Sequence, residues 1–424
     1  MKSVFQSPVG VTAQRTRRDP RAQVKILLLE TMVGAPNGGE GWAGLSHDQW
    51  GDVALLTRQH RLEAWAGRWL ADKTGVEVPH AIAQCWTRAY RQSAMRVLAM
   101  RAMLHRLSLI LGSEKIEHAA LKGAYLTWHC WPEPALRPSR DIDILVARTD
   151  ARRAFDVCKR AGLSEVAEYH VPFESALAKG KHLPLLRDDA SGIYVEIHIR
   201  LATPGEIITE DRIADFTSAA LSRAQAHPLG DTAMRYLDPT DTLLHLIIHG
   251  AYDHLFDNGP LQFGDLRFLL NSHNVDWHRF WRDADLLGCR RACDLVFAIL
   301  RRLSPALVAG HPLAGGGTVP DHVVDAALIN SLPDLDRRSE VRLRSTWREL
   351  DWAGRVHLSA VRSRDAMRRF QRMVQRSGRS ALWLFGQWGV RRVLAVASWR
   401  STPEFAAESD NYDLLRRWLS DPRP

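Results

Sequence analysis

The chain has 424 residues, 46% hydrophobic and 25% charged, which is ordinary globular composition with enough length for two or three domains. Five scattered cysteines, odd in number and without a C-x-x-C pair, suggest neither a disulfide framework nor a zinc knuckle and fit a reducing cytoplasm. The net charge of +9 sits at the ends, because residues 1–23 and 355–400 together carry +14 and the rest about −5, so it indicates no nucleic-acid groove around the central residues.

Neither end of the chain predicts a membrane or secretory segment. Residues 1–24 are polar and basic and are expected to form a flexible tail. The apolar stretch that follows is ended by Glu30 and is too short for a secretory signal. The most apolar run, "ALWLFGQWGVRRVLAVASW", is interrupted at its centre by Arg391 and Arg392, so no transmembrane span is expected. We expect a cytoplasmic location.

Residues 25–112 are expected to form an N-terminal helical region. Two stretches, 48–75 and 81–112, place apolar residues three and four positions apart, which is typical of amphipathic helices. Each stretch ends on glycine, a common helix stop.

The pattern changes between residues 113 and 235. "KIEHAALKG" predicts a short strand ending in glycine, "AYLTWHCW" a helical turn or two, "DIDILVA" a strand and "GIYVEIHIRL" an alternating strand. "TDARRAFDVCKRAG" predicts a helix with Thr149 or Asp150 as its N-cap and Gly162 at its end.

Helical spacing returns after residue 236. Residues 236–310 are expected to form a helical domain, 310–340 a linker or irregular loop rich in Gly, Pro and Asp, and 311–424 an Arg- and Trp-rich C-terminal region. The predicted fold class is therefore α+β, with a small mixed sheet flanked by N-terminal and C-terminal helical regions.

Asp141 and Asp143 open an apolar strand and point to the same face, with carboxylates about 7 Å apart. Two like charges held this close need solvent or a cation between them, and a divalent metal is the usual partner. At an exposed strand end, a solvated pair or a turn cap would explain the same two residues.

Glu196, in "GIYVEIHIR", is the best candidate for a third carboxylate. It lies among Val195 and Ile197, where an uncompensated charge would be costly to bury. His198 and Arg200 follow on the same predicted strand face. A third acid could hold a second ion about 4 Å from the first.

Lys122 precedes a glycine at the end of the first predicted strand. A strand, a Lys-Gly turn and a helix can offer backbone N–H groups to phosphates, while aspartates hold metal on the other side. Only eight of the 57 basic residues are lysines, yet Lys122, Lys179 and Lys181 all fall in this part of the chain.

These motifs, "HAALKGAYLTWHCWPEPALRPSRDIDILV", "KHLPLL" and "VEIHIRL", resemble the uncharacterised bacterial nucleotidyltransferase family of the DNA polymerase β-like superfamily. The resemblance runs from about residue 25 to residue 300 and includes "DTLLHLIIHG" and "FGDLRFLL". It implies a nucleotidyltransferase palm at 113–235, flanked by helices. The chain departs from the family in two places: Lys-Gly replaces the superfamily's Gly-Ser turn, and "EIHIR" replaces the common "ELHW".

The resemblance implies a set of site residues. Asp141, Asp143 and Glu196 would be catalytic carboxylates that bind Mg²⁺ or Mn²⁺, and Glu196 could also accept a proton. The nucleoside triphosphate, with ATP as the expected substrate, would meet Lys122, Gly123, Arg137, Lys181, His182 and His198.

Several of these residues have a purely structural alternative. Arg137 could instead be a surface arginine that pairs with Glu133, and His182 and His198 could be hydrogen-bonded structural histidines. His245 and His249 have zinc-ligand spacing but no third ligand, so core histidines are favoured. Asp265 could shape an acceptor pocket or stabilise a helix dipole, and Cys289 and Cys293 are expected to be core thiols.

The function that follows is transfer of an NMP from an NTP to a hydroxyl of a small molecule or peptide, with release of pyrophosphate. One alternative is a toxin-like or regulatory enzyme that modifies tRNA or a protein, with the basic C-terminal region as a docking surface, although nucleic acid is not the favoured partner. Another is a non-catalytic nucleotide-binding scaffold. The Arg-rich helices around Trp383, Trp388 and Trp399 could bind a membrane surface, an RNA backbone or an acidic partner, but a solvated helix face with a tryptophan-lined core contact is favoured.

Overall fold

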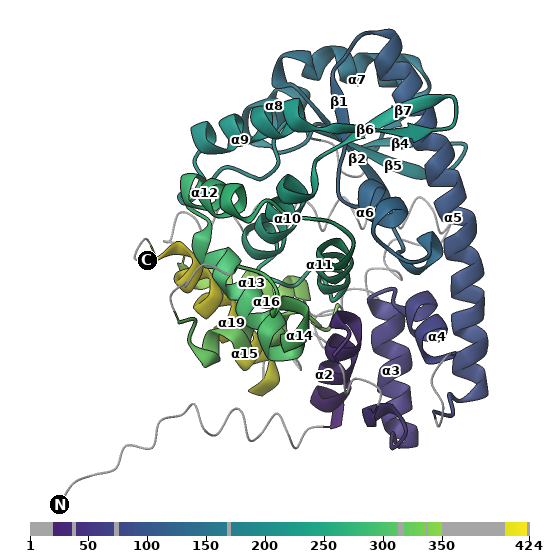
Figure 1. Cartoon of the computed structure of the whole chain (residues 1–424), viewed down its shortest axis with the longest axis vertical. Coiled ribbons are helices and arrows are strands. Elements are labelled where there is room, and N and C mark those ends of the chain that lie inside the picture. The colour runs from purple at the N-terminus through teal and green to yellow at the C-terminus, as the bar shows by residue number, and fades with distance from the viewer. Residues whose placement is uncertain are drawn as a thin grey trace, which may run out of the picture.

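In the computed structural model, a seven-stranded mixed sheet lies at one end of the molecule and a large group of helices at the other (Figure 1). The structure describes residues 20–35, 40–71, 76–167, 171–312, 318–335, 338–349 and 403–421. The predicted α+β class, a small mixed sheet flanked by helices, is confirmed.

The sheet brings the two predicted site strands side by side. The strands are β1 (His118–Ala120), β2 (Asp141–Val146), β3 (Leu163–Glu165), β4 (Leu186–Asp188), β5 (Ile193–His198), β6 (Gln225–Leu229) and β7 (Thr232–Tyr236). They follow the order β3-β4-β5-β2-β1-β7-β6, in which β2 is parallel to β5 and antiparallel to β1. The register pairs Asp143 with Glu196. Because paired residues point to the same face, these two carboxylates are neighbours.

The alternation of β5 separates a core face from a polar face. Ile193, Val195 and Ile197 are at most 1% exposed and belong to the hydrophobic core. Glu196 and His198 point to the opposite face, as the sequence alternation predicted. The polar face is therefore fixed by the burial of its apolar neighbours, since a slip of one residue would reverse both sets.

Four helices belong to the sheet end: α6 (Gly123–His129), α7 (Ala151–Arg160), α8 (Phe173–Lys179) and α9 (Glu210–Arg223). The predicted helix near residue 150 is α7, with Asp150 at its N-cap. The Asp150 side chain accepts from Arg153 and makes no capping hydrogen bond. Gly162 follows the end of α7 with φ +96°, a conformation that glycine adopts easily.

The N-terminal region is helical as predicted, with α2 (Pro20–Val33), α3 (His47–Gln59), α4 (Glu63–Ala71) and α5 (His80–Ser113). The stretch expected as one helix at 48–75 is broken between α3 and α4, where Arg61 has φ 58°. α5 extends along one side of the molecule from these helices to the sheet (Figure 1). Its buried Leu104, Leu107 and Leu111 join the common core.

The C-terminal helices are α10 (Pro239–Ile248), α11 (Leu261–Ser272), α12 (Trp277–Leu287), α13 (Arg290–Leu303), α14 (Pro305–Val308), α15 (Asp321–Asn330), α16 (Arg338–Glu349) and α19 (Pro403–Ser420), with a π-helix η5 (His249–Asp253) after α10. The expectation of a linker at 310–340 is wrong, because α15 buries Val323, Val324 and Ala327 in the core. Residues 355–400, including Trp383, Trp388 and Trp399, lie outside the described residues.

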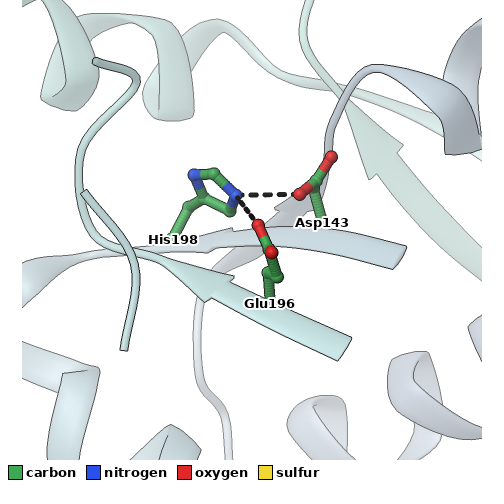
Figure 2. A group of neighbouring side chains, drawn as sticks. All are labelled: Asp143, Glu196 and His198. Carbon is green, nitrogen blue, oxygen red and sulfur yellow. Dashed lines mark hydrogen bonds and ion pairs between the residues drawn. The ribbon is translucent and has the colours of Figure 1, made fainter. Parts of the chain in front are cut away.

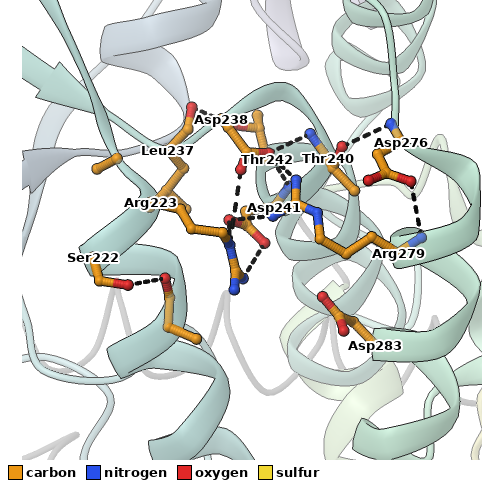
Figure 3. A network of polar contacts seen from close by, with 12 residues as sticks. Ser222, Arg223, Leu237, Asp238, Thr240, Asp241, Thr242, Asp276, Arg279 and Asp283 are labelled. Carbon is orange, nitrogen blue, oxygen red and sulfur yellow. Dashed lines mark hydrogen bonds and ion pairs between the residues drawn. The ribbon is translucent and has the colours of Figure 1, made fainter.

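Matched ion pairs join the sheet end to the helical end (Figure 3). Arg223 of α9 donates to both carboxylate oxygens of Asp241 at 2.9 and 2.8 Å. Arg279 of α12 donates to Asp238 at 2.6 Å, and the Asp238 side chain also caps the first turn of α10. The start of α10 is therefore fixed to both neighbours by charge-assisted hydrogen bonds.

One cluster of buried apolar residues runs from α2 through the sheet to α19. The predicted domain boundaries within this continuous core remain predictions. Within the described ranges, no helix is both long and apolar enough to cross a membrane.

Candidate metal and nucleotide site

Two carboxylates and one imidazole converge where β2 and β5 pair. Asp143, Glu196 and His198 each bring one potential ligand atom within 4.8 Å of the others. The Nε2 atom of His198 lies 2.8 Å from Asp143 Oδ1 and 3.4 Å from Glu196 Oε2 (Figure 2). The donor set of two carboxylates beside an imidazole could hold a divalent cation.

Asp141 lies two residues before Asp143 and therefore on the same face of β2. The predicted carboxylates Asp141, Asp143 and Glu196 thus share one face, while the tightest group in the described part of the chain contains His198 instead of Asp141. The roles of all four residues as ligands remain predictions.

Lys122 lies beside these acids in an unusual backbone conformation. Its φ of 40° and ψ of −111° are typical of glycine, and such a conformation costs a lysine about 1–3 kcal/mol. The Nζ atom lies 3.4 Å from Asp143 Oδ2, on the side away from His198. The Lys-Gly turn therefore brings a cation to Asp143, and Lys122 carries the positive φ, not Gly123.

The charges of the cluster shift the pKa values of its members. Burial alone would raise the pKa of Asp143, but Lys122 and His198 hold it well below the ordinary value. Burial would lower the pKa of Lys122, but the surrounding carboxylates raise it. His198, which is also buried, has a raised pKa because it bonds to Asp143 and Glu196. Asp143 and Lys122 are therefore both charged at neutral pH.

Asp141 is the least compensated acid of the site. Burial, together with the charges of Asp143 and Glu196, raises its pKa to about 6. Three carboxylates thus lie together: Lys122 contacts Asp143, His198 contacts Asp143 and Glu196, and the charges of Lys122 and Arg61 partly offset Asp141. This excess of negative charge on oxygen atoms favours a hard divalent cation such as Mg²⁺ or Mn²⁺.

A cleft of about 880 Å³ opens beside the carboxylates. Asp141 and Glu196 line it on one side, and the other lining includes Arg140, Lys179, Lys181, His182 and Tyr194. A cleft of this volume can hold a nucleotide. Its cations beside a carboxylate cluster suit a triphosphate bound through a divalent ion.

Arg200 holds the loop that carries the two lysines of the cleft. It is 1% exposed and donates to the carbonyls of Leu177 and Gly180 at 3.2 and 2.6 Å, and also to Glu210. The sequence suggested that Arg200 continues the polar face of the strand, but β5 ends at His198 and the guanidinium closes the end of α8. Arg200 therefore acts on the cleft through Lys179 and Lys181.

Sequence reasoning missed Asp253, the partner of Lys181. The Lys181 ammonium lies 2.7 Å from Asp253 Oδ2, and His249 Nδ1 lies 3.0 Å from the same oxygen. The hydrogen bonds from these two residues outweigh burial and lower the pKa of Asp253. No local pattern marks this contact, because Lys181 and Asp253 are far apart in the sequence.

The spacing of His245 and His249 produces no zinc site in the described part of the chain, where the one cluster of potential ligands is that of Asp143. His245 is 1% exposed, and burial lowers its pKa well below the ordinary value. Cys289 and Cys293 are buried free thiols, as predicted.

Arg137 pairs with Asp265 and not with Glu133, so the structural alternative of a surface pair with Glu133 is wrong. Its guanidinium is buried and donates to both oxygens of Asp265 at 2.7 and 2.8 Å. Asp265 also accepts from Trp131, which explains its place in α11 better than an effect on the helix dipole. A direct phosphate contact by Arg137 remains a prediction.

Gly123 is required by the close approach of Arg137. A Cβ atom at this position would lie 2.7 Å from Arg137 Nη1 and 2.9 Å from Ser139 Oγ. Any larger residue would displace a guanidinium that is fixed by Asp265. The turn that carries Lys122 is thus packed against a rigid ion pair.

Comparison with known families agrees with this geometry. The family model of an uncharacterised nucleotidyltransferase matches residues 46–305, which is more than half of the chain. A comparison with curated proteins gave no match. The matched residues include the sheet, the lysine-bearing cleft and the carboxylate cluster. The chain therefore belongs to this family of uncharacterised nucleotidyltransferases.

Proposed function

We propose that the protein transfers an NMP from an NTP, with ATP as the expected substrate, to a hydroxyl of a small molecule or peptide and releases pyrophosphate. The observation that carries this proposal is the register of β2 and β5, which puts Glu196 beside Asp143 at the edge of a lysine-lined cleft. The family match supports the reaction class. We also propose a DNA polymerase β-like palm and a cytoplasmic location, for which the five free cysteines are favourable.

Asp141, Asp143 and Glu196 would hold Mg²⁺ or Mn²⁺, because oxygen donors with excess negative charge suit these ions. When bound, the ion supplies Lewis-acid stabilisation of the phosphate oxygens. Lys179 and Lys181 would attract the triphosphate, and Lys122 would lie closest to the reacting end because it contacts Asp143.

In the transfer step the acceptor oxygen bonds to the α-phosphorus, and the bond from that phosphorus to the bridging oxygen of the β-phosphate breaks. Pyrophosphate leaves with the electron pair of that bond, and the acceptor proton passes to a base. Glu196 is the candidate for this base, since it lines the cleft.

The experiment measures binding of α-labelled ATP and release of pyrophosphate, with and without Mg²⁺, for the wild type and for Asp143→Asn. We expect metal-dependent ATP binding by the wild type and its loss in the variant. The matched control is Asp231→Asn, which changes an exposed aspartate paired with His105. Absence of metal-dependent ATP binding by the wild type would contradict the proposal.

The C-terminal helices cannot be deleted to test whether the basic C-terminal region docks a tRNA or protein acceptor, because α19 is part of the common core. Leu415 and Leu419 of α19 are buried in the common core. Arg342 and Tyr412 both donate to the fully buried Asp257. Removal of these helices would expose core residues, so loss of activity in the truncated chain would report unfolding.

A further inference from the structure

His198 could either bind the metal ion of the site or donate a hydrogen bond to the carboxylates that bind it. The side chain is 0% exposed at the end of β5. One ring nitrogen, Nε2, faces Asp143 and Glu196, and the other points away from both carboxylates (Figure 2). That second nitrogen, Nδ1, is buried and has no hydrogen-bond partner among the residues that the structure describes.

A histidine that binds a metal uses the lone pair of one nitrogen and almost always donates the N–H of the other to a carboxylate, a carbonyl or water. For His198, binding through Nε2 would move the hydrogen to Nδ1, where no acceptor lies within the described part of the protein. A buried N–H without a partner is expensive. The surroundings of Nδ1 therefore disfavour ligation through Nε2.

The opposite arrangement satisfies the ring hydrogen. With the hydrogen on Nε2, the ring donates to Asp143 at 2.8 Å and approaches Glu196 at 3.4 Å. One N–H then faces two carboxylates that belong to different strands. Such a donor offsets their mutual repulsion and fixes the distance between them. In this neutral form of the ring, Nδ1 carries no hydrogen and needs no acceptor.

We infer that His198 is a positioning residue that donates its Nε2–H to Asp143 and Glu196, and that the divalent ion of the site is bound by carboxylate oxygens without a histidine nitrogen. This inference rests on the proposed function for the ion itself. It predicts an oxygen-seeking ion, Mg²⁺ or Mn²⁺, over zinc.

The first test needs no metal. The metal-free full-length protein is labelled with ¹⁵N-histidine, and long-range nitrogen–proton NMR spectra identify which ring nitrogen of His198 carries hydrogen, with His198→Gln to assign the signals. We expect a protonated Nε2. A neutral ring with its hydrogen on Nδ1 would overturn the inference, even if the protein proves not to be a nucleotidyltransferase.

The second test examines the ion. Pulsed electron paramagnetic resonance of Mn²⁺ on the same labelled protein, with and without ATP, detects a directly bonded nitrogen and separates histidine nitrogen from adenine nitrogen by the ¹⁵N label. We expect no bonded histidine nitrogen, and its detection would overturn the inference. Failure of Mn²⁺ to bind would contradict the proposed function, whereas the NMR result would still decide the hydrogen position.

Two variants separate donation from packing. His198→Gln keeps an N–H donor near the position of Nε2, and His198→Leu keeps bulk without a donor. We expect His198→Leu to bind Mn²⁺ roughly tenfold more weakly than the wild type, as for loss of other residues that orient metal ligands, and His198→Gln to restore most of that loss. Equal Mn²⁺ affinity of the leucine variant and the wild type would contradict the positioning role.

Discussion

Acidic side chains are buried in two regions of the molecule, between the sheet and the helices and on one face of the sheet. In the first region arginines match the acids, and in the second the acids outnumber the basic groups that contact them. Between the sheet and the helices, two acids share two arginines: Arg223 donates to Asp241 and lies 3.9 Å from Asp238, and Arg279 donates to both. Asp265 likewise receives two hydrogen bonds from a single arginine. These paired groups have fixed geometry and leave little net charge for a ligand.

On the sheet face, three carboxylates lie close together. Lys122 and His198 contact Asp143, and His198 also contacts Glu196 and lowers its pKa, which leaves Asp141 with the weakest compensation. Burial, together with Asp143 and Glu196, raises the pKa of Asp141 to about 6. Burial and Asp238 also raise the pKa of Asp241, but two arginines donate to that carboxylate and match its charge. Matched pairs therefore indicate a structural role, and an unmatched cluster in a cleft indicates a site for a cation.

The largest expected effect comes from breaking a matched pair. Asp265→Leu would leave Arg137 buried without its partner, and we expect the free energy of unfolding to fall by about 3–5 kcal/mol. Urea denaturation measures this change. The double variant Asp265→Leu with Arg137→Met should recover much of the loss, and an additive loss in the double variant would contradict the pairing.

Removing an acid from the unmatched cluster should affect function more than stability. Glu196→Gln would remove one charge beside Asp143, and we expect pyrophosphate release to fall by about a hundredfold or more, as for loss of other groups that stabilise charge in transfer reactions. Burial alone would raise the pKa of Glu196, but the hydrogen bond from His198 lowers it, so the ionised carboxylate adds some stability and thermal denaturation of the metal-free variant at neutral pH should show a small loss. A variant that retains wild-type turnover would remove Glu196 from the mechanism.

Asp141→Asn should stabilise the metal-free protein in a pH-dependent way. Burial and the neighbouring carboxylates raise the pKa of Asp141 from its ordinary value near 3.8 to about 6, so ionisation costs stability as the pH rises through this interval. We expect the variant to exceed the wild type by about 1–3 kcal/mol at pH 8 and to match it near pH 4, because each unit of pKa shift is worth about 1.4 kcal/mol. Denaturation in EDTA at both pH values measures the difference, and a difference independent of pH would show that Asp141 is not strained by its neighbours.

The smallest effect is expected at the exposed edge of the cleft. Lys179 is exposed, so Lys179→Met should weaken ATP binding only about two- to fivefold, consistent with the 0.2–1 kcal/mol of an exposed ion pair. The effect should decrease at high salt. Titration of ATP at two ionic strengths tests this, and an effect that does not change with salt would indicate a direct, buried contact.

The local parts of this arrangement could be predicted from the sequence, and the long-range parts could not. Alternation placed Glu196 and His198 on one face of β5, and the spacing of Asp141 and Asp143 placed both on one face of β2. The register between the strands depends on the whole sheet. It follows from no single motif.

The predictions that were wrong or incomplete also concern contacts between residues far apart in the sequence. Arg137 was weighed against its near neighbour Glu133, but it pairs with Asp265 of α11. Lys181 finds Asp253 in the π-helix η5, and no local pattern marks either partner. The helix α15 was missed because glycines and prolines around it obscure a short apolar pattern that tertiary packing stabilises.

The most direct test of the central claim is Mn²⁺ binding at equilibrium, measured by the loss of the free Mn²⁺ resonance on titration with protein, with and without a non-hydrolysable ATP analogue. We expect the wild type and Asp231→Asn to bind Mn²⁺ alike and Asp143→Asn to lose the tight site. Equal binding by the wild type and Asp143→Asn, or no binding by either, would contradict a divalent-cation site at the pairing of β2 and β5.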